Sequence, residues 1–207
     1  MPVFLYVGGK NPGSQTITAT GAGTFVVPYY AENLRVRMHG AGAGGVGHNG
    51  TTGVNGAAGG NTTFDALTAG GGGAPVSGST PGAGGIASGG DTNENGQQGG
   101  QFVDTNDGGA AGGTSFGGGG FSGAPASNGP GINGQIYGGG GSGARTTGSG
   151  WQGGGGGAFV EKVYTPGTLA PGASVSYNNG AGGAGGNSTL FDGGNGANGR
   201  ILIEWDY

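Results

Sequence analysis

Residues 34–61 read LRVRMHGAGAGGVGHNGTTGVNGAAGGN, and the stretch changes character at Gly40. Before that point, polar and apolar residues alternate from Leu34 to Met38, which is typical of a β-strand with one buried face. After it, glycine recurs at every third position from Gly44 to Gly59. A period of three matches the polyproline-II helix, which has about 3 residues per turn and no internal hydrogen bonds.

Glycine makes up 63 of the 207 residues, and only 32% of the residues are hydrophobic. This composition alone is typical of a disordered linker, because large side chains are too few to build a conventional core. The triplet spacing favours an ordered alternative, in which closely packed rods bond to each other through backbone N–H and C=O groups. A single chain folding back on itself fits better than a collagen triple helix, because the protein has only nine prolines.

The strand pattern returns at residues 14–20, 24–28, 158–164, 174–177 and 200–205. No segment shows a helical period of 3.6 residues, so we expect almost no α-helix. We predict an all-β and irregular fold in three parts. Residues 1–39 supply the first strands of a small β base, residues 40–157 form a bundle of packed polyglycine-II helices with loops, and residues 158–207 return strands to the base with further Gly-rich rods.

Several classes of function are not expected. Charged residues make up 8% of the chain, the net charge is −4, and the basic residues are scattered, so we expect no nucleic-acid binding. The absence of cysteine excludes disulfides and thiolate metal sites. No apolar run approaches the roughly 20 residues of a membrane helix, so we expect no membrane insertion. The N-terminal residues lack the basic region and cleavage site of a signal peptide, so we expect no export by that route.

We also expect neither enzymatic activity nor a cofactor. Residues 113–117 match a nucleophile elbow, but glycine is so common here that one such match arises by chance. His39 and His48 have no aspartate in a triad-like order. Residues 91–96 match the first half of a calcium loop, yet Phe102 stands where the bidentate glutamate is needed. We therefore interpret this segment as an Asx-rich turn and predict no metal site.

Short non-Gly segments interrupt the glycine tracts, and we interpret them as turns between rods. They lie at residues 91–95, 101–107, 115–116, 136–137 and 145–149. Bulky and charged residues in or beside these turns are candidates for receptor binding, because aromatic anchors dominate many recognition surfaces. The candidates are Asn93, Glu94, Phe102, Asp104, Asp107, Phe116, Phe121, Tyr137, Arg145 and Trp151. The alternative is that the aromatic residues cover the ends or sides of the rods and that the acidic residues are simply solvated.

A wider succession of motifs resembles a known family. It comprises Gly23–Pro28, Asn33–Gly45, Gly60–Phe64, Leu67–Gly73, Leu169–Val175 and Gly196–Trp205. This succession resembles the glycine-rich domain of bacteriophage tail-fibre and receptor-binding proteins, and it is similar to the long-tail-fibre tip adhesins of T-even-like phages. The resemblance covers most of residues 20–207. It implies a layered polyglycine-II sandwich whose loops contact outer-membrane proteins or glycans of the host. We expect no long N-terminal attachment domain such as those adhesins carry.

The resemblance implies a virion adhesin at a tail-fibre or spike tip, made in the host cytoplasm. Its partners would be a bacterial outer-surface protein or glycan and another virion protein, either a fibre or a tail component. It would act either as a homotrimer or as a single copy on a trimeric fibre. Two alternatives stay open: a structural capsid or tail decoration protein, and an ice-binding protein whose rods present a flat Ala/Thr face.

Overall fold

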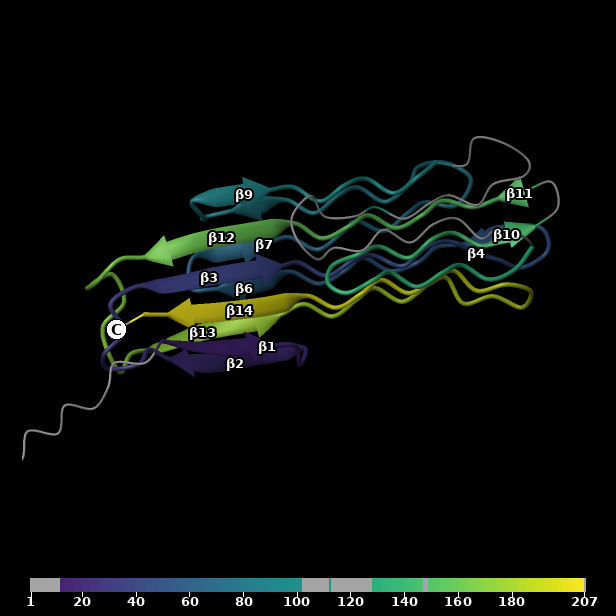
Figure 1. The fold of residues 1–207 in the computed structure, drawn as a ribbon. Coiled ribbons are helices and arrows are strands. Elements are labelled where there is room, and N and C mark those ends of the chain that lie inside the picture. Colours follow the sequence, from purple (N-terminus) through teal and green to yellow (C-terminus); the bar gives the residue numbers. More distant parts are fainter. Residues whose placement is uncertain (1–11, 102–111, 113–127, 147–148, 207) are drawn as a thin grey trace, which may run out of the picture.

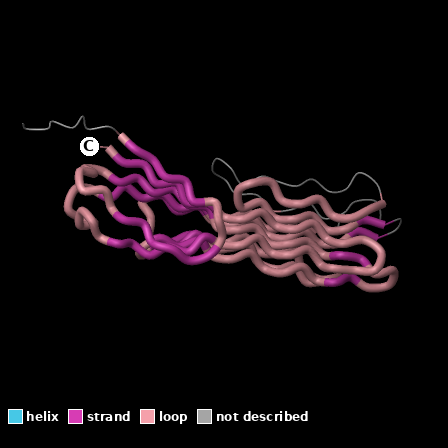
Figure 2. Tube along the Cα trace, turned by 90° about the horizontal axis from the view of Figure 1, so that it is seen from below, coloured by secondary structure: helices cyan, strands magenta, loops and turns pink. Residues whose placement is uncertain are grey.

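The computed structural model describes residues 12–101, 112, 128–146 and 149–206. The molecule has two parts that follow each other along one long axis, a base of paired strands and a bundle of irregular Gly-rich rods (Figure 1). The long strands gather at one end, and the rods run side by side toward the other (Figure 2). The described residues include no helix, so the predicted all-β and irregular fold with almost no α-helix is confirmed.

The base is a sandwich of two 5-stranded antiparallel sheets. The first sheet has the order β1 (Gly13–Ile17), β14 (Arg200–Trp205), β3 (Leu34–His39), β12 (Phe159–Tyr164) and β9 (Thr92–Glu94). The second has the order β2 (Gly21–Val26), β13 (Ser174–Asn179), β6 (Thr62–Phe64), β7 (Leu67–Ala69) and β8 (Ala87–Ser88). Two small hairpins belong to the rod bundle: β4 (Gly47–His48) with β5 (Gly53–Val54), and β10 (Arg145–Thr146) with β11 (Ser149–Gly150).

All the strands predicted from alternation are present, and both chain ends supply them. Residues 40–157, which we predicted as the bundle with its loops, also contribute β6, β7, β8 and β9 to the base. Each of these strands has only two or three residues. Alternation cannot be recognised over so few positions, so the pattern could not reveal them.

The hydrophobic core lies between the two sheets. Val36 and Met38 of β3 and Ile201 of β14 are completely buried. Phe64 of the opposite sheet is also completely buried, and its ring centroid lies 5.9 Å from that of Phe25. Full burial of each such side chain contributes about 1.5–3 kcal/mol. The base therefore has a conventional core, which the glycine-rich composition of the whole chain conceals.

The rods extend directly from the strands of the base. Described rods lie at residues 40–46, 54–61, 70–75, 82–86, 95–101, 129–134, 139–144, 151–158, 180–186 and 193–199. The rod at 40–46, for example, continues β3, and the rod at 151–158 leads into β12. Because strand and rod are one uninterrupted chain, the sandwich fixes where each of these rods starts.

The hydrogen bonds of the rod at 40–46 repeat with a period of three. Gly40 N, Ala43 N and Val46 N donate to carbonyl oxygens of the rod at 151–158, with N···O distances of 2.8, 2.9 and 3.0 Å. The intervening amides donate elsewhere. Ala41 N and Gly44 N bond to the rod at 54–61, while Gly42 N and Gly45 N bond to the rod at 193–199. Successive amides thus point to three different neighbours in rotation, as a helix with about 3 residues per turn requires.

The carbonyl oxygens of the same rod accept hydrogen bonds from further neighbouring rods. Ala41 O accepts from Gly72 N, Gly42 O from Gly183 N and Ala43 O from Gly141 N. The rod at 40–46 is therefore enclosed by the rods at 54–61, 70–75, 139–144, 151–158, 180–186 and 193–199. The predicted hydrogen bonding between neighbouring rods is confirmed, and it satisfies backbone groups that burial would otherwise leave without partners.

The hydrogen bonds also arrange the rods in layers. One layer holds the rods at 54–61, 70–75 and 82–86, joined by Gly59 N to Gly72 O and by Gly73 N to Ala83 O. The next layer holds the rods at 180–186, 40–46, 151–158 and 95–101. A third contains the rods at 193–199 and 139–144, with the rod at 129–134 packed against them. These layers continue the long axis of the sandwich (Figure 1).

Asparagine side chains complete the hydrogen bonding at the outer rods. Asn61 Oδ1 accepts from Gly71 N at 2.9 Å, and Asn195 Oδ1 accepts from Gly185 N at 2.8 Å. Asn198 Oδ1 accepts from Gly182 N at 2.8 Å. At these positions a side-chain carbonyl takes the place of the backbone carbonyl that a further rod would have supplied.

Candidate functional site

The end of the bundle that lies away from the base is built from turns between rods, and we call it the far end. Its described turn residues lie at 49–52, 76–80, 145–146, 149–150 and 187–192. The hairpin strands β4, β10 and β11 mark it in Figure 1. Hydroxyl and amide side chains are frequent in these turns: Asn49, Thr51, Thr52, Ser77, Ser79, Thr80, Thr146, Asn187, Ser188 and Thr189.

Local hydrogen bonds hold these turns. Asn49 Oδ1 accepts from the backbone N of Thr51 at 3.2 Å and of Thr52 at 2.9 Å, which is an Asx-type turn. Gly50 adopts φ 102°, a conformation that favours glycine. In the next turn, Val76 N donates to Thr80 O at 2.8 Å. The far end is thus a set of short, internally bonded turns on rods that packing holds in place.

An aromatic pair lies at the centre of the far end. The rings of His48 and Trp151 are stacked, with a centroid distance of 5.1 Å and an interplanar angle of 25°. His48 is buried, and its backbone exchanges hydrogen bonds with Phe191, of 2.7 and 3.0 Å. Trp151 is half-buried, and its ring lies so close to Gly53 that a Cβ there would be 2.6 Å from Trp151 Cε3. This pair joins three turns into one surface.

The described part of the rim around this pair is almost neutral. Among the described turns of the far end, the charged residues are Arg145 and Asp192. Two aliphatic side chains protrude there, Val76 with 48% and Leu190 with 51% of its surface exposed. The far end therefore offers aliphatic contacts and many hydroxyl and amide groups, rather than a strong charge.

The structure brings two predicted site residues together at the far end. Arg145 lies in β10 and Trp151 directly follows β11, and Arg145 pairs with Gly150 in that hairpin. Arg145 is half-buried, as is Trp151. The alternative that aromatic residues cover the ends of the rods applies in part to Trp151, because its ring packs on His48 and Gly53.

Tyr137 lies in a turn between two rods, as predicted, but this turn does not belong to the far end. Its turn at 135–138 points back toward the base, where Gly138 N donates to Asn198 O at 3.0 Å. The guanidinium of Arg200, the first residue of β14, lies 4.7 Å from the centroid of the Tyr137 ring. Successive turns of an up-and-down bundle lie at opposite ends, so this turn and the following hairpin at 145–150 cannot share one surface.

The prediction that Asn93 and Glu94 lie in a loop is wrong. Both belong to β9, which pairs with β12 at the edge of the first sheet, with Asn93 opposite Val160 and Glu94 opposite Phe159. Asn93 Oδ1 accepts from Gly90 N at 3.1 Å. The turn that the sequence indicated therefore comes just before these residues. Asn93 and Glu94 themselves lie at the edge of the sheet.

The side-chain oxygens of Asp91 and Asn95, in the calcium-loop pattern at residues 91–96, accept hydrogen bonds within the base. Asp91 Oδ2 accepts from Val163 N at 2.9 Å, and Asp91 Oδ1 lies 3.9 Å from Lys162 Nζ. Asn95 Oδ1 accepts from Ala87 N at 3.0 Å. Within the described residues, no group of three or more His, Cys, Asp or Glu side chains could hold a metal ion.

Five predicted site residues lie outside the described residues: Phe102, Asp104, Asp107, Phe116 and Phe121. The nucleophile-elbow pattern at residues 113–117 lies there too. His48, Val76 and Leu190 also lie at the far end, and the sequence did not indicate them as site residues. A usable signal was the clustering of Ser and Thr between glycine tracts, which marks the turns at 49–52, 76–80 and 187–192.

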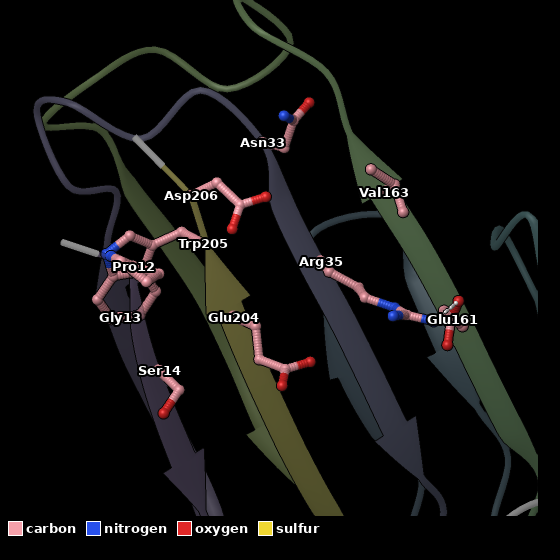
Figure 3. A pocket seen from close by; sticks show the side chains of 10 residues that line it. All are labelled: Pro12, Gly13, Ser14, Asn33, Arg35, Glu161, Val163, Glu204, Trp205 and Asp206. Atoms are coloured by element: carbon pink, nitrogen blue, oxygen red, sulfur yellow. Dashed lines mark hydrogen bonds and ion pairs between the residues drawn. The ribbon is translucent and has the colours of Figure 1, made fainter. Parts of the chain in front are cut away.

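The base has a separate feature, an open cleft of about 640 Å³ on the outer face of the first sheet (Figure 3). It is lined by Pro12, Gly13, Ser14, Asn33, Arg35, Glu161, Val163, Glu204, Trp205 and Asp206. Arg35 Nη2 lies 2.7 Å from Glu161 Oε1, and this hydrogen-bonded carboxylate raises the pKa of Arg35. Arg37 makes a second ion pair, with Glu204. The charges of this face are thus largely paired with each other.

No family model matches this chain, and no curated protein matches its sequence. None of the described segments forms a helix with the length and apolar character needed to cross a membrane.

Proposed function

We propose that the protein is a receptor-binding adhesin of a phage virion. In this proposal the far end contacts a bacterial surface protein or glycan, and the base docks on a fibre or tail component. The observation that carries the proposal is the division of the molecule: short polar turns lie at one end of a stiff bundle and a conventional sandwich lies at the other. Such a bundle holds its turns at a fixed distance from the base, as presentation of loops to a cell surface requires.

The centre and rim of the far end support a contact surface. Binding energy concentrates in a few central anchors surrounded by contacts that exclude water. Trp151, stacked on His48, occupies the centre, and Val76 and Leu190 protrude from two of the surrounding turns. The described part of the rim is nearly neutral and favours a receptor surface that is itself polar but weakly charged, since binding would gain little from electrostatic steering.

The opposite end of the molecule supports docking of the base. Tyr29 and Tyr30 follow β2 in the turn that leads to β3, away from the rods, and are 74% and 76% exposed. Tyrosine is enriched in protein interfaces because its ring and hydroxyl group serve apolar and polar contacts together. We propose this end as the surface that meets the virion partner, whether the adhesin is a single copy on a trimeric fibre or a homotrimer.

Adsorption to host cells tests the proposal. Labelled purified protein should bind receptor-bearing cells, and Val76→Lys with Leu190→Lys should weaken binding at least about fivefold, as loss of interface anchors does. The matched control is Ile86→Lys, which changes an aliphatic residue of 71% exposure on the side of the rod at 82–86 and should leave binding unchanged. Equal binding of all variants would contradict a receptor surface at the described turns.

The decoration alternative predicts many copies per virion and no affinity for cells, so copy number in the particle distinguishes it. Ice binding stays a second candidate because of one specific observation. In the rod at 180–186, Gly180, Gly183 and Gly186 are buried while Ala181 and Ala184 are exposed, which gives a regular outward row with a period of three. A thermal-hysteresis measurement tests this alternative, and the absence of hysteresis would exclude it.

A further inference from the structure

Eight positions of the chain place asparagine directly before glycine: Asn49, Asn55, Asn95, Asn128, Asn133, Asn179, Asn195 and Asn198. In this dipeptide the glycine backbone N can attack the asparagine side-chain amide, because glycine has no Cβ to obstruct the approach. The attack closes a five-membered succinimide ring. Whether it occurs in a folded protein depends on how the two reacting groups are held.

In most of these dipeptides the glycine backbone N donates a hydrogen bond within the rod bundle or the base. The glycine N donates to a described acceptor in six of them: Gly96 to Gly85 O, Gly129 to Arg145 O, Gly134 to Asn195 O, Gly180 to Thr62 Oγ1, Gly196 to Gly183 O and Gly199 to Gly180 O. Each attack would first break one of these bonds and move a packed backbone. The hydrogen bonds that build the bundle therefore protect these sites.

Asn55 and Gly56 are protected in another way. Asn55 Oδ1 accepts from Ser77 N at 2.7 Å, which holds the side chain toward the neighbouring turn. Gly56 is buried, and an added Cβ would lie 2.4 Å from Gly44 O. A new ring has no room at this position.

Asn49 and Gly50 differ from all of these. Both residues are exposed in the turn between β4 and β5, and no described group accepts a hydrogen bond from Gly50 N. An atom added at Gly50 would meet nothing within 4 Å. The nucleophile is therefore free, and the turn has space for the ring.

The turn also stabilises the charge that forms during attack. Negative charge develops on Asn49 Oδ1, which already accepts from the backbone N of Thr51 and Thr52 at 3.2 and 2.9 Å. Backbone donors aimed at a developing oxyanion lower the barrier of acyl-transfer reactions. Asn49 Nδ2, the leaving nitrogen, donates to Thr52 Oγ1 at 3.1 Å, so a hydroxyl group lies beside it.

We propose that Asn49 is a site of intramolecular deamidation at the far end. Gly50 N forms a bond to Asn49 Cγ, the bond from Cγ to Nδ2 breaks, and Nδ2 leaves as ammonia with the proton released by Gly50 N. Water then opens the succinimide to aspartate or isoaspartate. Each deamidation event consumes one water, releases one ammonia and needs no oxidant. The product adds a carboxylate to a surface whose described turns otherwise carry Asp192 as their acidic residue.

Peptide mapping of the folded full-length protein tests the proposal. After incubation at mildly alkaline pH, conversion at Asn49 should be at least about tenfold faster than at Asn133 or Asn195, a difference of about 1.4 kcal/mol in the barrier. At the two other sites the glycine backbone N must first leave its acceptor. Equal or slower conversion at Asn49 would overturn the proposal. In urea the difference between sites should disappear, and a difference that persists in urea would also overturn it, because sequence rather than structure would be its cause.

A variant tests the backbone donors to Asn49 Oδ1 separately from the free backbone N of Gly50. Thr51→Pro removes one backbone donor to Asn49 Oδ1 and should slow conversion at Asn49 severalfold while leaving Asn195 unchanged. Circular dichroism and thermal unfolding would establish that this variant folds. Unchanged conversion at Asn49 in the folded variant would overturn the role given to the backbone donors. The Asn49→Gln variant provides the baseline for the peptide map.

Discussion

Gly42 lies at a crowded point of the bundle, where the backbone of one rod meets the carbonyl groups of another. A Cβ at Gly42 would lie 2.0 Å from Gly139 O, and one at Gly44 would lie 2.0 Å from Ala184 O. Real carbon and oxygen atoms cannot approach so closely. Glycine is needed at such positions because of its size, whatever its backbone conformation.

The crowding leads to a direct prediction for Gly42→Ala. The added methyl group would force two buried rods apart, so we expect the free energy of unfolding to fall by at least about 1–3 kcal/mol, as overpacking does elsewhere. Chemical denaturation followed by circular dichroism measures this change. Ala184→Ser, at an exposed position of the rod at 180–186, is the control and should have almost no effect. Equal effects of both changes would contradict the packing described here.

Tyr164 gives a prediction for pH. Burial raises the pKa of Tyr164, and the nearby carboxylate of Asp65, which accepts from Tyr164 Oη at 3.2 Å, raises it further. The folded protein therefore keeps this proton above pH of about 10, the ordinary tyrosine value, where the unfolded chain releases it. Because the unfolded state then binds fewer protons, the free energy of unfolding decreases as pH rises beyond that value.

Urea denaturation at increasing alkaline pH measures this dependence. The wild-type protein should lose stability more steeply than Tyr164→Phe, which has no such proton to release. The two proteins share every other tyrosine, so the difference in slope belongs to this side chain. Parallel curves would show that Tyr164 titrates alike in the folded and unfolded states.

The sequence predicts the place of a single residue well only where that place does not depend on the packing of neighbouring rods. It indicated that Trp151 and Arg145 interrupt the glycine tracts, and both lie at the far end. It could not indicate the stacking of His48 on Trp151, because the two belong to different rods that only the folded bundle brings together. It could not indicate which end of the bundle holds the turn of Tyr137, since the direction of a rod depends on how many turns precede it.

At the scale of elements, alternation predicted the six strands at the chain ends, and the glycine triplets predicted rods. The run from Gly44 to Gly59 nevertheless covers two rods and the turn at 49–52 between them. The period continues across the turn, so spacing alone could not locate that boundary. The predicted turn at 136–137 is present, whereas residues 92–94 of the predicted turn at 91–95 form β9, because they pair with β12.

The asparagines of the outer rods allow a test at this scale. Asn195→Ala removes the acceptor of Gly185 N, so we expect the free energy of unfolding to fall by about 0.5–1.5 kcal/mol, the usual net value of one hydrogen bond. Asn187→Ala, an exposed asparagine after the rod at 180–186, is the matched control and should change it by less. Thermal or urea denaturation compares the two. A larger effect at Asn187 would contradict the role given to the outer asparagines.

At the scale of the molecule, two kinds of cohesion are joined in one chain. The base is held by side chains buried between its sheets, and the bundle by backbone bonds between rods with almost no side chains. Because rods continue strands, ordering of the base fixes the starting points of the rods and lowers the entropy that they lose on packing. This arrangement explains how a chain with 63 glycines can form an ordered, elongated fold.

Hydrogen–deuterium exchange of the rod at 40–46 tests this account most directly. Its amides belong to no described strand, yet each donates to a carbonyl group of an enclosing rod at 2.8 to 3.1 Å. We expect these amides to exchange as slowly as those of β3, because both require the folded core to open. Exchange as fast as that of an unstructured glycine-rich peptide would contradict a bundle held together by its backbone.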